Sequence, residues 1–402
     1  MILENFFILT LIKVAVVAFV LLTTLAYLQW IERKVIAHVQ LRVGPYRVGP
    51  HGLLQPLADV VKLITKEGLM PSHVNRLFYL LAPFVAVALA LTSIAVIPFG
   101  PEITIGPVKT WMQLTDLRIG ILFVLAVSSI GVYGVALGGW ASNNKYALLG
   151  GLRSSAQMIS YELPLGLAVA APLLLANTLS FRDMVNYQTG YWLGFIPRWN
   201  LFPEIFGFIV FVIAGFAETN RVPFDLPEAE NELVAGFHTE YSSMTFAAFF
   251  MAEYANMVTV TAVATLLFLG GWTPPFPAPY SDFIPILVFA IGGFTALYHG
   301  LNPARRKDKF TLPAAALVFL GLAAIFGVSI VVPALAVLKT ILMALFWFCG
   351  KVLLLLFVFI WVRATLPRFR YDQLMRFAWT GLFPIAVINL LVTGLIVALA
   401  TK

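Results

Sequence analysis

Long apolar runs alternate with short polar stretches along the whole chain, and this pattern predicts a bundle of membrane-spanning helices. A helix that crosses roughly 30 Å of hydrocarbon needs about twenty mostly apolar residues. Ten runs approach or reach that length, the fifth and seventh being the shortest: 6–30, 77–98, 117–139, 156–177, 202–217, 239–269, 283–300, 312–336, 340–361 and 378–400. The expected fold class is therefore an all-α polytopic membrane protein, organised as one membrane domain over residues 1–402.

The composition strengthens this prediction. Hydrophobic residues make up 60% of the chain, charged residues only 11%, and the mean hydropathy is +0.91. Charged residues alone form about a quarter of a soluble domain. The first run follows Glu4, contains Lys13, exceeds the length of a signal-peptide core and is not followed by a small-residue cleavage pattern. We therefore expect it to remain as a membrane helix.

The basic residues predict how the chain is oriented, because cytoplasmic loops keep the excess of Lys and Arg. If the N-terminus lies outside, eighteen of the 26 basic residues fall in inside loops and six in outside loops. This bias predicts that both termini lie outside. The net charge of +7 then mainly reflects topology, and it gives little support to a nucleic-acid partner.

Cysteine and histidine usage argues against redox chemistry within this chain. Cys349 is the single cysteine and lies in an apolar run, so neither an intrachain disulfide nor a thiolate-ligated iron–sulfur cluster is expected. The five histidines show neither metal-ligand spacing nor a facing pair suited to haem. No Gly-rich phosphate loop follows a strand. We expect no metal site, no nucleotide site and no electron carrier here.

Residues 31–76 form the first polar stretch, which we expect to be a cytoplasmic loop. Gly-Pro pairs at 44–45 and 49–50 predict a turn. After it, apolar residues recur at helical spacing and predict an amphipathic helix on the membrane surface. Its apolar face would comprise Leu53, Leu54, Leu57, Val60, Val61 and Ile64. The helix is either a surface anchor or the wall of an entry for a lipid-soluble molecule.

Acidic residues gather at two further polar stretches. Glu162 lies several residues inside the fourth run, where an ionisable group is costly and points to function; the alternative is an interfacial acid paired with Arg153 or Lys145. The expected acidic cytoplasmic loop, residues 217–238, and its flanks hold six of the nineteen carboxylates. Glu253 is predicted to lie about 20 Å beyond Glu240 along one helix, inside the membrane.

Crowded, partly dehydrated acids exchange protons with one another more readily than isolated ones. The acidic stretch therefore favours a proton path or an electrostatic coupling element. The alternative for residues 225–232 is a solvated loop that docks onto a basic partner. That alternative explains neither Glu162 nor Glu253.

Several segments together resemble a known family. They are "ERKVIAHVQLRVGPYRVGPHGLLQPLADVVKLITKE", "SSAQMISYELPLG", "ETNRVPFDLPEAENELVAGFHTEY", "FFMAEYANM" and "VRATLPRFRYDQLMRFAW". Their order is similar to that in the NuoH family, which supplies a membrane subunit of the proton-pumping NADH:quinone oxidoreductase, respiratory complex I. The resemblance covers residues 1 to about 275 and 339–402.

The resemblance implies a membrane subunit without a redox centre, in the bacterial plasma membrane. Such a subunit forms much of the quinone tunnel against peripheral iron–sulfur subunits, and it begins an acidic path toward antiporter-like neighbours. Quinone is the implied substrate and no cofactor is bound covalently. NADH, FMN and the iron–sulfur clusters are implied to lie in partner subunits.

The same resemblance assigns residues to two groups. The implied quinone-tunnel residues are Glu32, Arg33, Arg42, Asp59, Arg221, Asp225, Arg363, Arg368 and Arg370. The implied proton-path residues are Glu162, Glu218, Glu228, Glu230, Glu232, Glu240 and Glu253.

One segment departs from the family's usual eight spans. Residues 277–338 hold two of the ten apolar runs, separated by the basic "NPARRKDKF", and are interpreted as an inserted two-helix hairpin. Two added spans preserve the orientation of everything downstream. We expect a peripheral hairpin that faces lipid or a neighbouring protein of the complex.

Two other functions remain open from the sequence. A membrane anchor of an energy-converting hydrogenase would bind no quinone, and the complete first polar stretch favours the quinone-binding family over it. A stand-alone ion antiporter would need a lysine–acid site repeated in two halves, and the chain shows no internal repeat. Lys351 is the one deeply placed lysine, suited either to helix packing or to proton relay.

Overall fold

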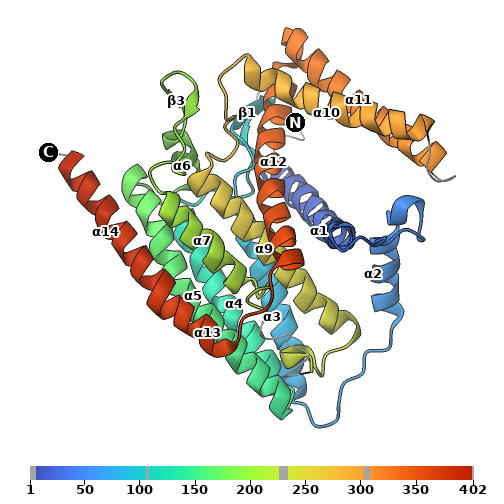
Figure 1. The fold of residues 1–402 in the computed structure, drawn as a ribbon, viewed down its shortest axis with the longest axis vertical. Helices are drawn as coiled ribbons and strands as arrows, with labels where there is room; N and C mark the ends of the chain where they lie inside the picture. The colour runs from blue at the N-terminus through green and yellow to red at the C-terminus, as the bar shows by residue number, and fades with distance from the viewer. Residues whose placement is uncertain (1–5, 106–107, 226–233, 303–307, 401–402) are drawn as a thin grey trace.

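Helices build almost all of the computed structural model, which describes residues 6–105, 108–225, 234–302 and 308–400 (Figure 1). The longer helices are α1 (Phe6–Val39), α3 (Arg76–Ile94), α4 (Gly120–Ala141), α5 (Lys145–Ala176), α7 (Ile205–Glu218), α9 (Ser243–Phe268), α10 (Tyr280–Leu301), α11 (Asp308–Val331), α12 (Ala336–Thr365) and α14 (Phe383–Ala400). The shorter ones are α2 (Gln55–Thr65), α6 (Phe181–Tyr187), α13 (Tyr371–Arg376), the 3-10 turns η1 (Pro50–Gly52), η2 (Gly236–His238) and η3 (Pro333–Leu335), and the π-helical η4 (Phe377–Leu382).

Within the described ranges, nine helical segments are long and apolar enough to cross a membrane, and α13, η4 and α14 together make one of them. This confirms the predicted all-α polytopic class. The predicted fifth span, 202–217, is the exception. Its helix, α7, has 14 residues and so reaches only about 21 Å, too short to cross the hydrocarbon on its own.

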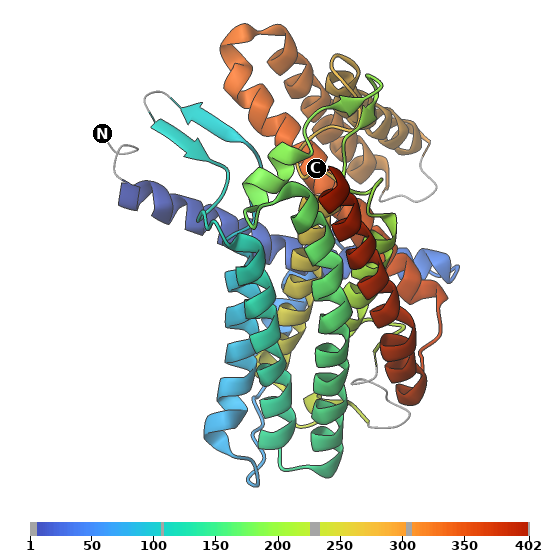
Figure 2. The same ribbon diagram turned by 90° about the vertical axis from the view of Figure 1, so that its left-hand side faces the viewer.

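Helices α3, α4, α5, α7 and α9 run side by side as the central bundle, with α14 along its outer face (Figure 1). Small residues allow the close packing: an added Cβ on Gly139 of α4 would lie 2.6 Å from the carbonyl oxygen of Ala147 in α5. Helix α1 crosses the bundle steeply (Figure 2). Its Lys13 ammonium donates to Thr110 Oγ1 at 2.5 Å and to the Trp111 carbonyl at 2.9 Å.

Three helix boundaries differ from the sequence prediction. Helix α1 does not stop near residue 30 but continues to Val39, because residues 31–39 contain neither Gly nor Pro. Helix α5 begins at Lys145, where the Asn144 side chain accepts the Tyr146 N–H at 2.9 Å. Helix α9 begins only at Ser243, so Glu240 lies in the preceding turn and, contrary to the prediction, does not share a helix with Glu253.

Two small hairpins were not predicted. Strand β1 (Glu102–Ile105) pairs antiparallel with β2 (Val108–Trp111), and β3 (Tyr191–Trp192) pairs with β4 (Ile196–Pro197). Strands of two to four residues are too short for a period-2 pattern to stand out between apolar helices.

Helices α10 and α11 pack against each other as a helical hairpin beside α12, within the segment interpreted as a two-helix insertion (Figure 1). The packing is tight: an added Cβ on Gly293 would lie 2.7 Å from the Leu320 side chain, and one on Gly300 would lie 2.5 Å from Pro313. Large apolar side chains such as Leu287 remain exposed on it.

Candidate functional site

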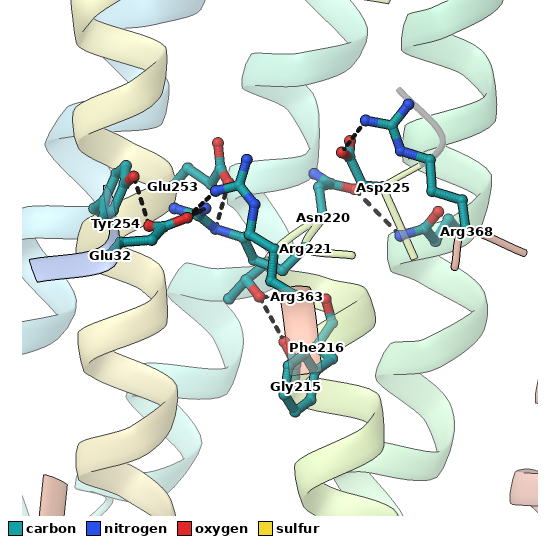
Figure 3. Close-up of polar contacts among 12 residues, drawn as sticks. Glu32, Gly215, Phe216, Asn220, Arg221, Asp225, Glu253, Tyr254, Arg363 and Arg368 are labelled. Carbon is teal, nitrogen blue, oxygen red and sulfur yellow. Dashed lines mark hydrogen bonds and ion pairs between the residues drawn. The ribbon is translucent and has the colours of Figure 1, made fainter. Parts of the chain in front are cut away.

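A buried cluster of ion pairs joins α1, α9, α12 and the turn after α7 (Figure 3). Arg221 Nη1 lies 3.0 Å from Glu32 Oε1, and Arg221 Nε lies 2.7 Å from Glu253 Oε1. Arg363 also pairs with Glu32. The Tyr254 hydroxyl donates to Glu32 Oε2 at 2.7 Å. Four elements that are distant in sequence are therefore tied together through Glu32 and Arg221.

Opposite charges balance one another in this cluster, which contains two carboxylates and two guanidinium groups. Glu32 and Arg221 are only 3% and 4% exposed. Burial acts to lower the pKa of Arg221, but the carboxylates of Glu253 and Glu32 outweigh it and raise that pKa, so the guanidinium stays charged. The guanidinium also lies 4.3 Å from the centre of the Tyr254 ring.

The turn after α7 positions both Arg221 and Asp225. Asn220, at φ +50°, and Pro223 prevent α7 from continuing. From α5, the Gln157 amide donates to the carbonyls of Ala217 and Phe224 at 2.8 and 2.7 Å, which fixes the turn. Buried Asp225 then pairs with Arg368 at 2.8 Å, as Figure 3 shows.

A third ion pair fixes the amphipathic helix against the end of α1. Arg33 Nη1 lies 2.9 Å from Asp59 Oδ2, and the Gln55 amide donates to Asp59 Oδ1 at 2.9 Å. Two other predicted tunnel residues lie apart from these ion pairs. Exposed Arg42 donates to the Gln40 side chain at 2.7 Å, and exposed Arg370 is the N-cap of α13.

A largely apolar cavity of about 600 Å³ opens between α1, α2 and α9. Its lining comprises Leu22, Leu25, Ala26, Gln29, Arg33, Asp59, Val60, Lys62, Leu63, Met244, Phe246, Ala247, Ala248, Phe250, Met251 and Tyr254. Tyr254 therefore belongs both to this cavity and to the charge cluster. The cavity brings three of the predicted tunnel residues, Arg33, Asp59 and Glu32, within one or two contacts of each other.

A second cavity, of about 50 Å³, lies on the other side of the cluster and has room for ordered water. Glu253, Glu218, Asn256 and Ser128 are among its lining residues. Ser128 donates to the carboxylate of Glu218, and its neighbour on α4, Ser129, donates to that of Glu162. A polar route therefore runs from the charge cluster through Glu253 and Glu218 toward Glu162.

The remaining predicted acids do not extend this route. Glu240 accepts a hydrogen bond from the Asn144 amide at 2.6 Å, and its backbone carbonyl accepts one from the Tyr79 hydroxyl at 2.8 Å. It is not among the residues that line either cavity. Glu228, Glu230 and Glu232 lie outside the described residues.

Sequence reasoning missed Tyr254 and the Ser128–Ser129 pair. Tyr254 directly follows Glu253 in "FMAEYANM", and the serine pair interrupts an apolar run, so adjacency to an acid and polarity within a span were the available signals. Neither signal says which acid the hydroxyl group meets. Those partners come from packing between different helices.

Lys351 of α12 serves helix packing. Its ammonium donates to the carbonyls of Leu269, Gly271 and Thr273 at 2.6, 2.8 and 2.6 Å and lies 4.3 Å from the Trp199 ring centre. Backbone carbonyls hold no exchangeable proton. Of the two roles open from the sequence, these contacts favour packing over proton relay.

His238 provides a pH-dependent test of how the small cavity is built. It lies in η2 among aromatic rings, and burial lowers its pKa from 6.5 to about 3. As the pH falls below 6.5, the unfolded chain takes up this proton first, so stability is full above pH 6.5 and declines toward pH 3. We expect a loss of about 2 kcal/mol between pH 7 and 5.

Chaotrope denaturation of the detergent-purified chain measures this loss. The His238→Gln variant should lose the pH-dependent component, while exposed His73→Gln should keep it. An identical pH dependence in wild type and His238→Gln would show that His238 is not the responsible group.

Comparison with known proteins identifies the family. The family model for NADH dehydrogenase matches residues 12–394. The chain is 65% identical over 405 residues to a NuoH-type membrane subunit of the NADH-quinone oxidoreductase of Solibacter usitatus (strain Ellin6076), covering 100% of this chain and 99% of the relative. The chain belongs to the NuoH family of NADH-quinone oxidoreductase subunits.

Two further NuoH relatives match at similar coverage. That of Koribacter versatilis (strain Ellin345) is 48% identical, with 98% of each chain covered, and that of Geobacter metallireducens (strain ATCC 53774 / DSM 7210 / GS-15) is 44% identical, with 98% of this chain and 97% of the relative covered. The predicted family is confirmed. Membership in the NuoH family and the nine apolar helices of the described ranges make this a multi-pass membrane protein. Because the Solibacter alignment covers the whole chain, it includes residues 277–338.

Proposed function

We propose that this NuoH-family chain forms part of the entry path and reaction chamber for a quinone, and that its buried charge cluster passes the effect of quinone reduction to a proton path. One observation carries the proposal. Glu253 and Tyr254 are adjacent on α9, yet Tyr254 lines the large apolar cavity and Glu253 the small polar one. Both contact the Glu32–Arg221 pair.

The large cavity has the chemistry that a quinone requires. A volume of about 600 Å³ lies within the usual range of roughly 300–1,000 Å³ for small-molecule sites. Its walls are mostly apolar and suit a lipid-soluble tail, while the Tyr254 hydroxyl offers a polar contact to a ring oxygen. Val60 and Leu63 of α2 are part of the wall, which favours an entry over a mere surface anchor for the amphipathic helix.

The charge cluster suits coupling because quinone reduction adds two electrons and two protons to form a quinol. Negative charge that develops beside Tyr254 would disturb the balance between Glu32, Arg221 and Glu253. A proton that leaves or reaches Glu253 has the small cavity and Glu218 next to it. On this proposal the acids of residues 217–238 lie near the start of the path.

The assembly follows from the family. We propose other complex I subunits as partners: peripheral iron–sulfur subunits on the cytoplasmic face and antiporter-like subunits within the bilayer. NADH and FMN belong to those partners, the membrane is the bacterial plasma membrane, and both termini lie outside. Exposed Arg42 and Arg370 suit contact with peripheral subunits. The relatives are named as quinone oxidoreductases, which favours this function over a hydrogenase anchor.

Filling the large cavity tests the proposal. Ala247 lines it, and Ala247→Trp should raise the KM for quinone about tenfold by removing space and contacts worth roughly 1.4 kcal/mol. NADH oxidation with a soluble artificial acceptor should be unchanged, because that reaction does not need the cavity. Steady-state kinetics on membrane vesicles provide both readings.

The matched control is Ala314→Trp, an exposed alanine of α11 that does not line the cavity. It should leave the quinone KM unchanged. An unaltered quinone KM in Ala247→Trp, with the complex assembled at normal levels, would overturn the assignment of this cavity to quinone.

A further inference from the structure

The α10–α11 hairpin contacts the segment between α1 and α2, residues 40–54, which we call the entry loop. His51 Nε2 of this loop lies 2.8 Å from Thr311 Oγ1 and 3.3 Å from Asp308 Oδ1, both in the first turns of α11. The Tyr46 hydroxyl donates to the same Asp308 oxygen at 3.4 Å. In Figure 1 the entry loop lies beside this end of the hairpin. The three side chains around Asp308 are partly shielded from solvent.

The entry loop is folded tightly enough to transmit such a contact. An added Cβ on Gly52 would collide with the Pro45 carbonyl oxygen, so the two ends of the turn touch. The Tyr46 and His51 rings meet edge to face with centroids 5.3 Å apart. His51 has φ +51°, a strained conformation for a residue with a side chain, and its contacts with α11 hold it there.

A short link leads from this contact to the large cavity. Leu53 and Leu54 donate backbone hydrogen bonds to the Pro50 and Val48 carbonyls at 2.9 and 3.3 Å. Helix α2 begins immediately afterwards at Gln55, and its Asp59, Val60 and Leu63 line the cavity. Displacing His51 would therefore displace the cavity wall.

We infer that the α10–α11 hairpin holds the entry loop in place through His51, Asp308 and Thr311, and thereby positions the α2 wall of the quinone entry. This inference rests on the proposed function, because it assigns the hairpin a part in that entry. His51, Asp308 and Thr311 are positioning residues. The prediction of a peripheral hairpin facing lipid or a neighbour gives it no such role, and the exposed Leu287 face remains available to lipid.

The test compares hairpin variants within the whole complex. Asp308→Asn combined with Thr311→Val removes both partners of His51, while Thr311→Ser keeps the hydroxyl. The matched control is Asp282→Asn, which removes a different carboxylate ion pair of the hairpin, 2.7 Å from Lys339 of α12. Native gels confirm that each variant assembles.

Hydrogen–deuterium exchange of peptides spanning residues 40–65 measures the loop independently of quinone. Loss of a charge-assisted hydrogen bond should speed exchange about tenfold in the double variant, while Thr311→Ser and Asp282→Asn keep the wild-type rate. The quinone KM of the double variant should rise several-fold, with NADH oxidation by a soluble acceptor unchanged.

The two readouts separate the possible failures. Unchanged exchange in the double variant would overturn the inference that α11 holds the loop. Faster exchange with an unchanged quinone KM would overturn the assignment of this loop to quinone entry, and with it this part of the proposed function. Faster exchange in Asp282→Asn as well would show that the hairpin acts as a whole and not through His51.

Discussion

Replacing Arg221 with Met is expected to cost about 3–5 kcal/mol of stability, because Glu32 and Glu253 would stay buried without the guanidinium between them. Arg363 would still neutralise Glu32, but Glu253 would lose its 2.7 Å contact with Arg221. Quinone reductase activity should fall at least about a hundredfold, since each 1.36 kcal/mol lost from transition-state stabilisation is a factor of ten. Thermal denaturation and quinone-dependent NADH oxidation measure the two effects.

Two further arginine variants define this prediction. Arg221→Lys keeps the charge but not the fork of donors that reaches two carboxylates at once, so it should fall between wild type and Arg221→Met. Exposed Arg118→Met is the matched control and should change neither quantity. Near-normal stability and turnover in Arg221→Met would contradict the idea that Glu32 and Glu253 depend on this guanidinium.

The membrane architecture could be predicted from the sequence because it depends on local composition. Each long apolar run became a helix of spanning length except α7, where Pro203 precedes the helix and the Asn220–Pro223 turn ends it. The same local reasoning failed at Glu32. A hydropathy boundary near residue 30 ended the helix early, whereas backbone hydrogen bonding continues through polar residues to Val39.

The composition of the site was accessible, but its pairings were not. The resemblance placed Glu32, Arg221 and Arg363 in one functional region. It could not show that a single Glu32 carboxylate meets partners 189 and 331 residues away. Such contacts depend on how α1 crosses the bundle, and no periodicity encodes that angle. The same limit applies to the contact of His51 with α11 across 260 residues.

Exposure separates the predicted residues that converge from those that do not. Glu32, Arg221 and Asp225 are buried and ion-paired, as a charge in a low-dielectric interior must be. Arg42 and Arg370 are exposed and lie apart from the cluster. Sequence similarity alone gives both kinds the same weight, and burial is what distinguishes a reaction chamber from a docking face.

Glu253→Gln is expected to lower quinone reductase activity by about a hundredfold, equivalent to roughly 2.7 kcal/mol, with little change in the quinone KM. The amide keeps the shape and an oxygen for Arg221 but removes the charge, which leaves the cluster with one more positive than negative group. Because Glu253 lines the small cavity and not the large one, quinone binding should be spared while the step that moves charge is lost.

Paired variants on the same route decide whether that loss concerns charge transfer. Glu253→Asp keeps the carboxylate and should retain much of the activity, and exposed Glu102→Gln on β1 should behave as wild type. Proton uptake by inverted vesicles, measured per NADH oxidised, separates slowed chemistry from lost coupling. Fully coupled turnover in Glu253→Gln would remove this residue from the path, because a neutral amide between Arg221 and the water-sized cavity could neither release nor accept the proton that the route requires.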